Sequence, residues 1–162
     1  MKTKEFVKKI TRTLIGAFAI GILTLPLLAE PDYGDHSSST LTTKAWNAMA
    51  QQQYDDALAY IAKCEELYGA EAKKMQASLT NYAPNDPKEE TTKLWALNDV
   101  GTCMFIKGEV LLKKGDKKGA LEAFNKLVKE YKYAQCWDPK GWFWKPAEAA
   151  KQKIVELQFE NE

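Results

Sequence analysis

The sequence is poor in the residues that most often carry catalysis or bind metals. It has one histidine, His36, and three cysteines, none of which lies in a Cys-x-x-Cys pair. Nucleophilic catalysis by serine or cysteine needs a base nearby, and structural zinc needs paired ligands at short spacing. We therefore expect no catalytic residues, no metal site and no cofactor.

The odd number of cysteines leaves at least one thiol unpaired within a monomer, even in an oxidising compartment. Free cysteine is among the most buried residue types in proteins. We interpret Cys64, Cys103 and Cys136 as separate, partly buried thiols on helices, and keep one disulfide as the alternative.

The chain also lacks an excess of charge of one sign. It carries 23 Lys and Arg against 22 Asp and Glu, and without residues 1–29 the count becomes 18 against 21, a net charge of about −3. Proteins that bind nucleic acid need a basic surface that faces the phosphates. The composition therefore argues against a nucleic-acid partner.

A long apolar run occurs only near the N-terminus. Residues 14–29 form an apolar stretch of 16 residues, after a basic start that includes Lys8, Lys9 and Arg12. A membrane-spanning helix needs roughly 20 apolar residues, whereas this shorter pattern is typical of a secretory signal. We predict a signal peptide over residues 1–29 and an exported protein, periplasmic or secreted, that meets the membrane only through this segment. An uncleaved N-terminal anchor is the alternative.

After this segment the sequence predicts a polar linker followed by helices. Residues 30–40 are rich in turn formers, serine and threonine, which indicates the linker. From residue 41 on, apolar residues recur at spacings of three and four. No segment alternates or is rich in Val and Ile, so we expect no sheet and an all-α fold. The predicted helices cover residues 41–51, 55–68, 70–82, 87–114, 117–131 and 146–157.

Turn and capping residues mark the boundaries between these helices. Gly69 breaks the helical pattern after the second helix, and Gly115 ends the fourth, because glycine adopts the left-handed turn at helix C-termini. Asp86 and Asp116 are placed to cap the helices that follow them, and Pro146 suits the first turn of the last helix.

Two parts of the sequence repeat each other. Residues 57–68 share their pattern with residues 120–131 at an offset of 63, and residues 70–74 share theirs with residues 147–151 at an offset of 77. The difference indicates about 14 inserted residues in the second copy. Units that repeat in this way stack to share a core. We predict one domain over residues 41–162, with units at about 41–82 and 87–158 and an insertion at 132–145.

The second unit resembles a tetratricopeptide repeat, a pattern of about 34 residues that forms two antiparallel helices. The match rests on small, turn and packing positions, namely Gly108, Leu111, Gly115, Asp116, Ala120, Phe124 and Leu127. The first unit matches at Ala45, Ala57 and Ile61, with Gln51, Gln52 and Gln53 in place of the glycine turn.

The resemblance implies a two-unit array of about six helices whose groove binds a partner without enzymatic activity. The spacing is also similar to that of short helical repeats in exported cell-envelope proteins. The implied partner is therefore an envelope or secreted protein or peptide.

The insertion over residues 132–145 is the one segment that repeat packing does not require. It holds five aromatic residues, with a turn at residues 138–141 that would bring some of them together: Tyr133, Trp137, Trp142, Phe143 and Trp144. These rings either seal the open end of the array or form a binding surface, since aromatic residues are enriched at binding hot spots. We take all five as candidate partner-binding residues. The alternative ligand is a glycan, either β-glucan or peptidoglycan. In that case this chain is a glycan-binding protein or a small glycan-active protein.

Three acids, Glu130, Asp138 and Glu148, lie near this segment in the sequence. Glycoside hydrolysis needs two carboxylates roughly 5–10 Å apart in a cleft. Most charged side chains on helices are solvated. We therefore interpret the three acids as surface residues.

Overall fold

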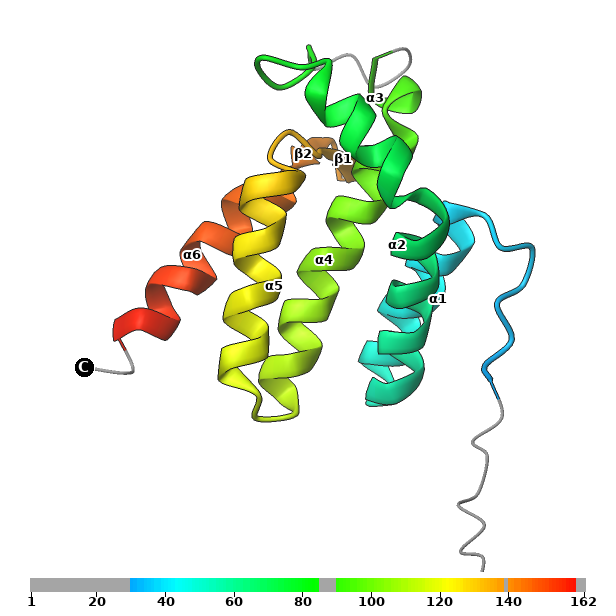
Figure 1. Ribbon diagram of the computed structural model, residues 1–162, viewed down its shortest axis with the longest axis vertical. Helices are drawn as coiled ribbons and strands as arrows, with labels where there is room; N and C mark the ends of the chain where they lie inside the picture. The colour runs from blue at the N-terminus through cyan, green and yellow to red at the C-terminus, as the bar shows by residue number, and fades with distance from the viewer. Residues whose placement is uncertain (1–29, 85–89, 139, 160–162) are drawn as a thin grey trace, which may run out of the picture.

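The computed structural model describes residues 30–84, 90–138 and 140–159, which form a mostly helical protein with one small sheet. The helices are α1 (Ser38–Ala50), α2 (Tyr54–Ala77), the single turn α3 (Glu90–Lys93), α4 (Trp95–Lys113), α5 (Lys117–Glu130) and α6 (Pro146–Phe159), and the strands are β1 (Cys136–Asp138) and β2 (Trp142–Trp144) (Figure 1). The predicted helical class is confirmed. The predicted signal peptide, residues 1–29, and the predicted cap Asp86 lie outside the described residues.

α4 lies at the centre of the arrangement. Successive long helices pack on each other, α1 on α2, α2 on α4, α4 on α5 and α5 on α6, and α4 also contacts α1 and α6. Figure 1 shows these helices side by side, with α1 behind α2 and α6 at the opposite edge. The chain therefore forms two helical hairpins, α1–α2 and α4–α5, followed by α6.

α1 begins inside the segment that was predicted as a linker, because Ser37 caps it. The Ser37 hydroxyl accepts a hydrogen bond from the Thr40 N–H at 3.2 Å, as expected for serine at the N-terminus of a helix. The residues before α1 are also docked: the ring of Tyr33 contacts the ring of Tyr60 at 6.0 Å.

Gly69 does not end a helix, and the helices predicted over residues 55–68 and 70–82 are one helix, α2, which ends at Ala77. An isolated glycine costs a helix only about 1 kcal/mol relative to alanine. The residues that follow Gly69 are good helix formers, Ala70, Glu71 and Ala72 among them. The first predicted unit, residues 41–82, therefore contains two helices, α1 and α2, in place of the three that were predicted.

The helix predicted over residues 87–114 is also divided differently. α3 and α4 are separated at Leu94, which leaves helical geometry with φ of −99° and ψ of 26°. The Leu94 side chain is buried, so the break places an apolar residue in the core. The longest predicted helix is the one over residues 87–114, but α4 has only 19 residues. The longest described helix is α2, with 24 residues.

The turns that close the two hairpins share one geometry. After α4, Gly115 has φ of +81°, and the N–H groups of residues 115 and 116 donate to the carbonyls three and five residues earlier, both at 2.9 Å. After α1, Gln52 has φ of +61°, and the N–H groups of residues 52 and 53 donate in the same way, at 3.1 and 2.8 Å. Both turns are Schellman motifs. The predicted turn at Gly115 is confirmed, and the glutamine run forms its counterpart.

Buried residues repeat between the hairpins at the same offset of 63 residues that relates their sequences. The buried pairs are Ala45 and Gly108, Ala57 and Ala120, Ile61 and Phe124, and Cys64 and Leu127. Equivalent positions in α1–α2 and α4–α5 thus face the same core. Asp116 caps α5 as predicted, since its side chain accepts a hydrogen bond from the Gly119 N–H at 2.8 Å.

The prediction of no sheet is wrong. β1 and β2 form an antiparallel pair in which Cys136 lies opposite Trp144, Trp137 opposite Phe143, and Asp138 opposite Trp142. Aromatic residues favour strands, because their rings pack across a pleated surface. Each strand has only three residues, which is too short for alternation to be recognised in the sequence.

Candidate binding pocket

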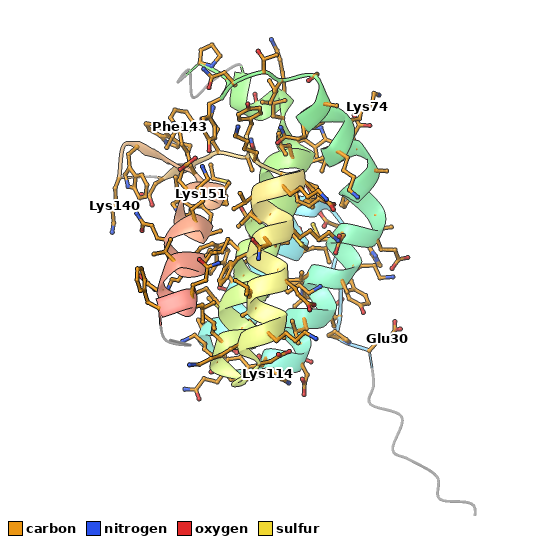
Figure 2. The ribbon with its side chains drawn as sticks, turned by 60° about the vertical axis from the view of Figure 1, so that its left-hand side comes forward. Glu30, Lys74, Lys114, Lys140, Phe143 and Lys151 are labelled. Atoms are coloured by element: carbon orange, nitrogen blue, oxygen red, sulfur yellow. The ribbon has the colours of Figure 1, made fainter. Side chains whose placement is uncertain are left out.

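The aromatic insertion folds as a β-hairpin at the end of α5 (Figure 1). Asp138 closes its turn: its carbonyl accepts from the Gly141 N–H at 2.9 Å, and its carboxylate accepts from the Lys140 N–H at 2.8 Å. Gly141 has φ of +98°, a conformation that favours glycine. The predicted tight turn is thus confirmed, and Figure 2 shows Lys140 at its outer tip.

Buried hydrogen bonds fix the base of the hairpin to the helices. Gln135 is fully buried, and its N–H donates to Asn98 Oδ1 of α4 at 3.0 Å. Its Nε2 donates to the Ala83 carbonyl at 3.0 Å. Next to it, the Cβ of Ala134 occupies the space that a side chain at Gly101 would need, 2.5 Å from the position of such a Cβ. The hairpin is therefore held in one place against α4.

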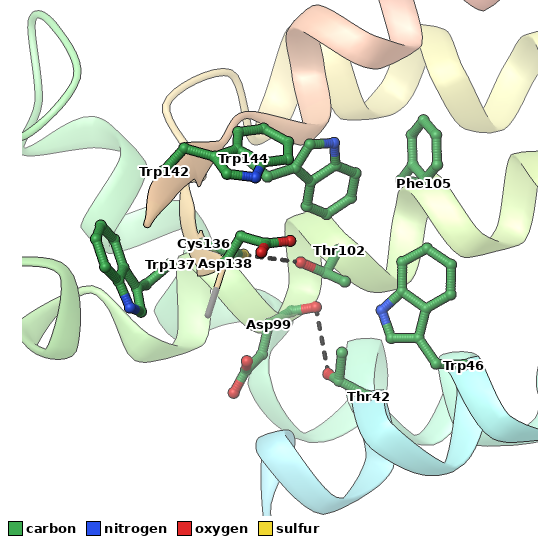
Figure 3. Close-up of a pocket in the computed structure, with 10 residues that line it drawn as sticks. All are labelled: Thr42, Trp46, Asp99, Thr102, Phe105, Cys136, Trp137, Asp138, Trp142 and Trp144. Carbon is green, nitrogen blue, oxygen red and sulfur yellow. Dashed lines mark hydrogen bonds between the residues drawn. The ribbon is translucent and has the colours of Figure 1, made fainter. Parts of the chain in front are cut away.

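A pocket of about 560 Å³ lies between this hairpin and the helices α1 and α4 (Figure 3). Its volume is within the roughly 300–1,000 Å³ that is usual for sites that bind small molecules or side chains. Its aromatic walls come from α1, α4 and the hairpin, namely Trp46, Phe105, Trp137, Trp142 and Trp144. The polar part of the lining is Thr42, Asp99, Thr102, Cys136 and Asp138.

Three of the five predicted partner-binding residues line this pocket. Trp144 lies inside it, whereas Trp137 and Trp142 stand at its rim and are 46% and 49% exposed. Phe143 and its cross-strand partner Trp137 project from the face of the hairpin opposite to Trp142 and Trp144, because side chains alternate along a strand, and their rings lie 5.1 Å apart. Trp137 still reaches the pocket lining from that face, whereas Phe143 does not.

Tyr133 lies away from the pocket and serves as an anchor. Its hydroxyl donates to the Thr80 carbonyl at 2.7 Å, and its backbone N–H donates to Gln76 Oε1 at 2.8 Å. Its ring packs edge-on against Tyr82 at 5.4 Å. The structure thus brings together three of the predicted residues and leaves Phe143 and Tyr133 outside the lining.

Trp144 connects the hairpin to the helices. Its ring meets Phe105 of α4 edge-on, with centroids 5.1 Å apart, and Trp46 of α1 at 6.2 Å. Edge-to-face contacts of this kind add to the apolar burial of the rings. Trp144 therefore covers the helices, whereas Trp137 and Trp142 remain accessible.

Polar groups lie on the floor of the pocket. The Asp99 carboxylate accepts a hydrogen bond from the Ser38 hydroxyl, and burial raises the pKa of Asp99 above its usual value. Thr102 Oγ1 lies 3.1 Å from Cys136 Sγ, and burial raises the pKa of that thiol to about 11. Figure 3 shows the Asp138 carboxylate turned inward, beneath the rings of Trp142 and Trp144.

The other acids near the insertion are held by basic partners outside the pocket. Glu148 accepts from Lys151 at 2.9 Å, which lowers its pKa. Glu130 pairs with Lys73 at 3.0 Å, with the same effect on its pKa. Within the part of the chain that the structure describes, no three His, Cys, Asp or Glu side chains are grouped closely enough to hold a metal ion.

The three thiols are free in the structure, with Cys64 and Cys103 buried and Cys136 partly buried. They are not isolated from one another: the Cys103 thiol hydrogen-bonds Cys64, and this contact together with burial raises the pKa of Cys103.

Among the described residues, no helix combines the length and apolar character that a membrane crossing needs.

Sequence reasoning missed the pocket residues that the helices supply, above all Trp46, Phe105 and Asp99. Trp46 and Phe105 are partly buried aromatic residues on α1 and α4. Their large apolar side chains were a usable signal, but nothing in the sequence relates them to an insertion that follows α5.

The comparisons with known proteins return no matching family model, curated protein or solved structure.

Proposed function

We propose that this chain is an exported, non-enzymatic interaction scaffold with a tetratricopeptide-like array, which binds a segment of an envelope or secreted protein in the pocket under the aromatic hairpin. The observation that carries the proposal is the pair of half-exposed rim tryptophans, Trp137 and Trp142, beside a pocket that is already formed. Exposed tryptophan next to a concave site is typical of binding surfaces.

The tetratricopeptide-like part of the proposal is supported by the way the hairpins repeat. Gly108 of α4 and Ala45 of α1 are small, buried and 63 residues apart. The turn residues Gly115 and Gln52, which both have positive φ, are also 63 residues apart. The first helices of the two hairpins, α1 and α4, also contact each other. Repeated hairpins in which each unit packs on the next are the basis of such arrays.

The position of the pocket agrees with partner binding by an array of this kind. Its helical residues all come from α1 and α4, the first helices of the two hairpins: Thr42, Trp46, Asp99, Thr102 and Phe105. In proteins that the chain resembles, a groove of the array receives the partner. The hairpin adds three tryptophans to one end of such a surface.

The chemistry of the lining favours binding over catalysis. Cys136 is the only thiol in the lining of this pocket, and burial raises its pKa, which disfavours the reactive thiolate. No histidine lines the pocket to act as its base. His36 instead lies beside Tyr33, with ring centroids 5.7 Å apart.

Selection of peptides from a phage-displayed random library tests the proposal. We expect peptides that bind the protein to lose about tenfold or more in affinity when Trp142 or Trp137 is replaced by alanine, as hot-spot residues do. Trp95→Ala is the matched control, because Trp95 is 43% exposed and does not line the pocket. Equal losses in all three variants, or no enriched peptide, would contradict the proposal.

Export has its own test. The basic start and the apolar run of residues 14–29 support cleavage after Ala29. We expect N-terminal sequencing of the exported protein to begin at Glu30. A protein that keeps Met1 and remains in the membrane fraction would instead be anchored.

Glycan binding is the second candidate, and one observation favours it. The exposed ring of Trp142 lies next to the carboxylate of Asp138, so that a sugar could stack on the ring while its hydroxyls donate to the carboxylate. Titration of tryptophan fluorescence with β-glucan and peptidoglycan fragments tests this candidate. No change with either polymer rules it out.

A further inference from the structure

We infer that the pocket binds an organic cation, and that this cation is the basic side chain of a lysine or arginine in the partner segment. The inference rests on the proposed function, because it identifies which kind of residue in the bound segment enters the pocket. It goes further by assigning the charge of that residue.

The walls of the pocket are suited to a cation because they are aromatic. The faces of aromatic rings carry negative electrostatic potential, and tryptophan is the strongest partner for a cation among the natural side chains. Four of the lining residues are tryptophans, and Phe105 completes the aromatic wall. These rings stand at different angles, since Trp144 meets Phe105 at 85° and Trp46 at 57°. A group inserted between them would contact rings on more than one side.

The pocket is also acidic. Its lining includes two acidic residues, Asp99 and Asp138, and no lysine, arginine or histidine. The Asp138 carboxylate turns inward, whereas Asp99 has its carboxylate directed away from the rings of Trp142 and Trp144 (Figure 3). Asp99 accepts from Ser38, and Asp138 accepts from the Lys140 backbone, so both are held by neutral donors. Neither takes part in an ion pair with another of the described residues. The Lys140 side chain is at the outer tip of the hairpin (Figure 2).

Four tyrosine rings outside the pocket carry a lysine of their own. Each pair has the lysine Nζ above a tyrosine ring: Lys44 over Tyr60 at 5.7 Å, Lys63 over Tyr33 at 5.4 Å, Lys132 over Tyr133 at 4.9 Å, and Lys145 over Tyr82 at 4.1 Å. Of the lysines that the structure describes, none lies in this way over a pocket tryptophan. The tryptophans that line the pocket are thus open to a cation from outside.

Charge complementarity then selects a basic side chain over an apolar one. An apolar side chain would remove water from the Asp138 carboxylate without giving it an opposite charge, which is unfavourable. A lysine or arginine would place its methylene groups against the rings and its charged end beside the Asp138 carboxylate. The site of about 560 Å³ has room for such a side chain and part of its backbone.

A pair of matched peptides tests the inference on the full chain. The probes are acetyl-Gly-Gly-Lys-Gly-Gly-amide and the same peptide with norleucine, which keeps the methylene groups and lacks the charge. We expect tryptophan fluorescence and calorimetry to show binding of the lysine peptide about tenfold tighter than binding of the norleucine peptide. Asp138→Asn should bring the two affinities together, because asparagine keeps the acceptor for the Lys140 N–H and removes the charge.

Controls separate this inference from the proposed function. Glu122→Gln removes one exposed acid on α5, outside the pocket lining, and should leave the preference for lysine unchanged. Equal affinity for the two peptides would overturn the inference while the proposed partner binding stands. Absence of binding by both would also overturn it, whereas the library selection alone decides the proposed function. Choline is the third probe, and tighter binding of choline than of the lysine peptide would overturn the assignment to a side chain.

Discussion

The edge of the Phe124 ring lies where a side chain at Gly108 would be. A Cβ on Gly108 would come within 2.2 Å of Phe124 Cε1, much closer than atoms in contact. Phe124 is fully buried and packs on Phe105 at 5.8 Å, so moving its ring would disturb other residues of the core. α4 and α5 therefore approach each other at this point only because residue 108 is glycine.

Replacing Gly108 with alanine should destabilise the protein. Overpacking of a buried site costs about 1–3 kcal/mol, which exceeds the gain of about 1 kcal/mol that alanine brings to a helix. Urea unfolding measures the difference. Gly69→Ala is the matched control, because its Cβ would lie 3.4 Å from Glu65 Cγ, an ordinary contact, and this variant should be equally stable or more so. A similar gain in stability for both variants would contradict the close approach at Gly108.

The two hairpin turns allow a reciprocal exchange of residues. Gln52 adopts φ of +61°, which strains a residue with a side chain, whereas Gly115 adopts φ of +81° without strain. We expect Gln52→Gly to stabilise the protein by about 0.5–1 kcal/mol and Gly115→Gln to destabilise it by a similar amount. A Cβ at Gly115 meets no atom within 4 Å, so the second change reports backbone strain alone. Thermal unfolding of both variants measures the two effects, which should have opposite signs.

Positions where one local interaction decides the structure were predictable from the sequence. Asp116 caps α5 because its carboxylate reaches the Gly119 N–H, and Gly115 permits the left-handed turn before it. Pro146 begins α6 for a similar local reason. Gly69 misled the prediction, because whether a glycine stops a helix depends on the residues around it as well as on the glycine itself.

The pocket could not be predicted, because its walls come from segments that are far apart in the sequence. The contact between Trp46 and Trp144 depends on the packing of α1 beside α4 and on the docking of the hairpin. That docking depends on the buried residue Gln135, whose backbone N–H donates to Asn98 Oδ1 and whose side chain donates to the Ala83 carbonyl. A polar residue in the core has no distinguishing pattern in a sequence, so the position of the hairpin followed only from the structure.

Cys136 should react slowly with alkylating reagents in the folded protein. Burial raises its pKa to about 11, although the hydrogen bond with Thr102 opposes the shift. The thiolate is the reactive form, and an ordinary cysteine has a pKa of about 8.5, so the rate at pH 8 should be lower by about two orders of magnitude. Raising the pH from 8 to 10 should increase the rate by about tenfold per unit. Mass spectrometry after timed reaction with iodoacetamide measures it, with the unfolded chain as the control. A rate that levels off near pH 9 would contradict this assignment.

The hairpin tryptophans should divide into one that stabilises the fold and one that does not. Trp144 packs on both Phe105 and Trp46, so Trp144→Ala removes contacts to α1 and α4 and should lower the free energy of unfolding by about 2–4 kcal/mol. Trp142 is 49% exposed and lies at the rim, so Trp142→Ala should change stability by less than about 1 kcal/mol. Urea unfolding followed by circular dichroism compares the two variants without depending on the lost tryptophan signal. Equal, large losses would mean that the whole hairpin is part of the core, and that its exposed rings are not free to receive a ligand.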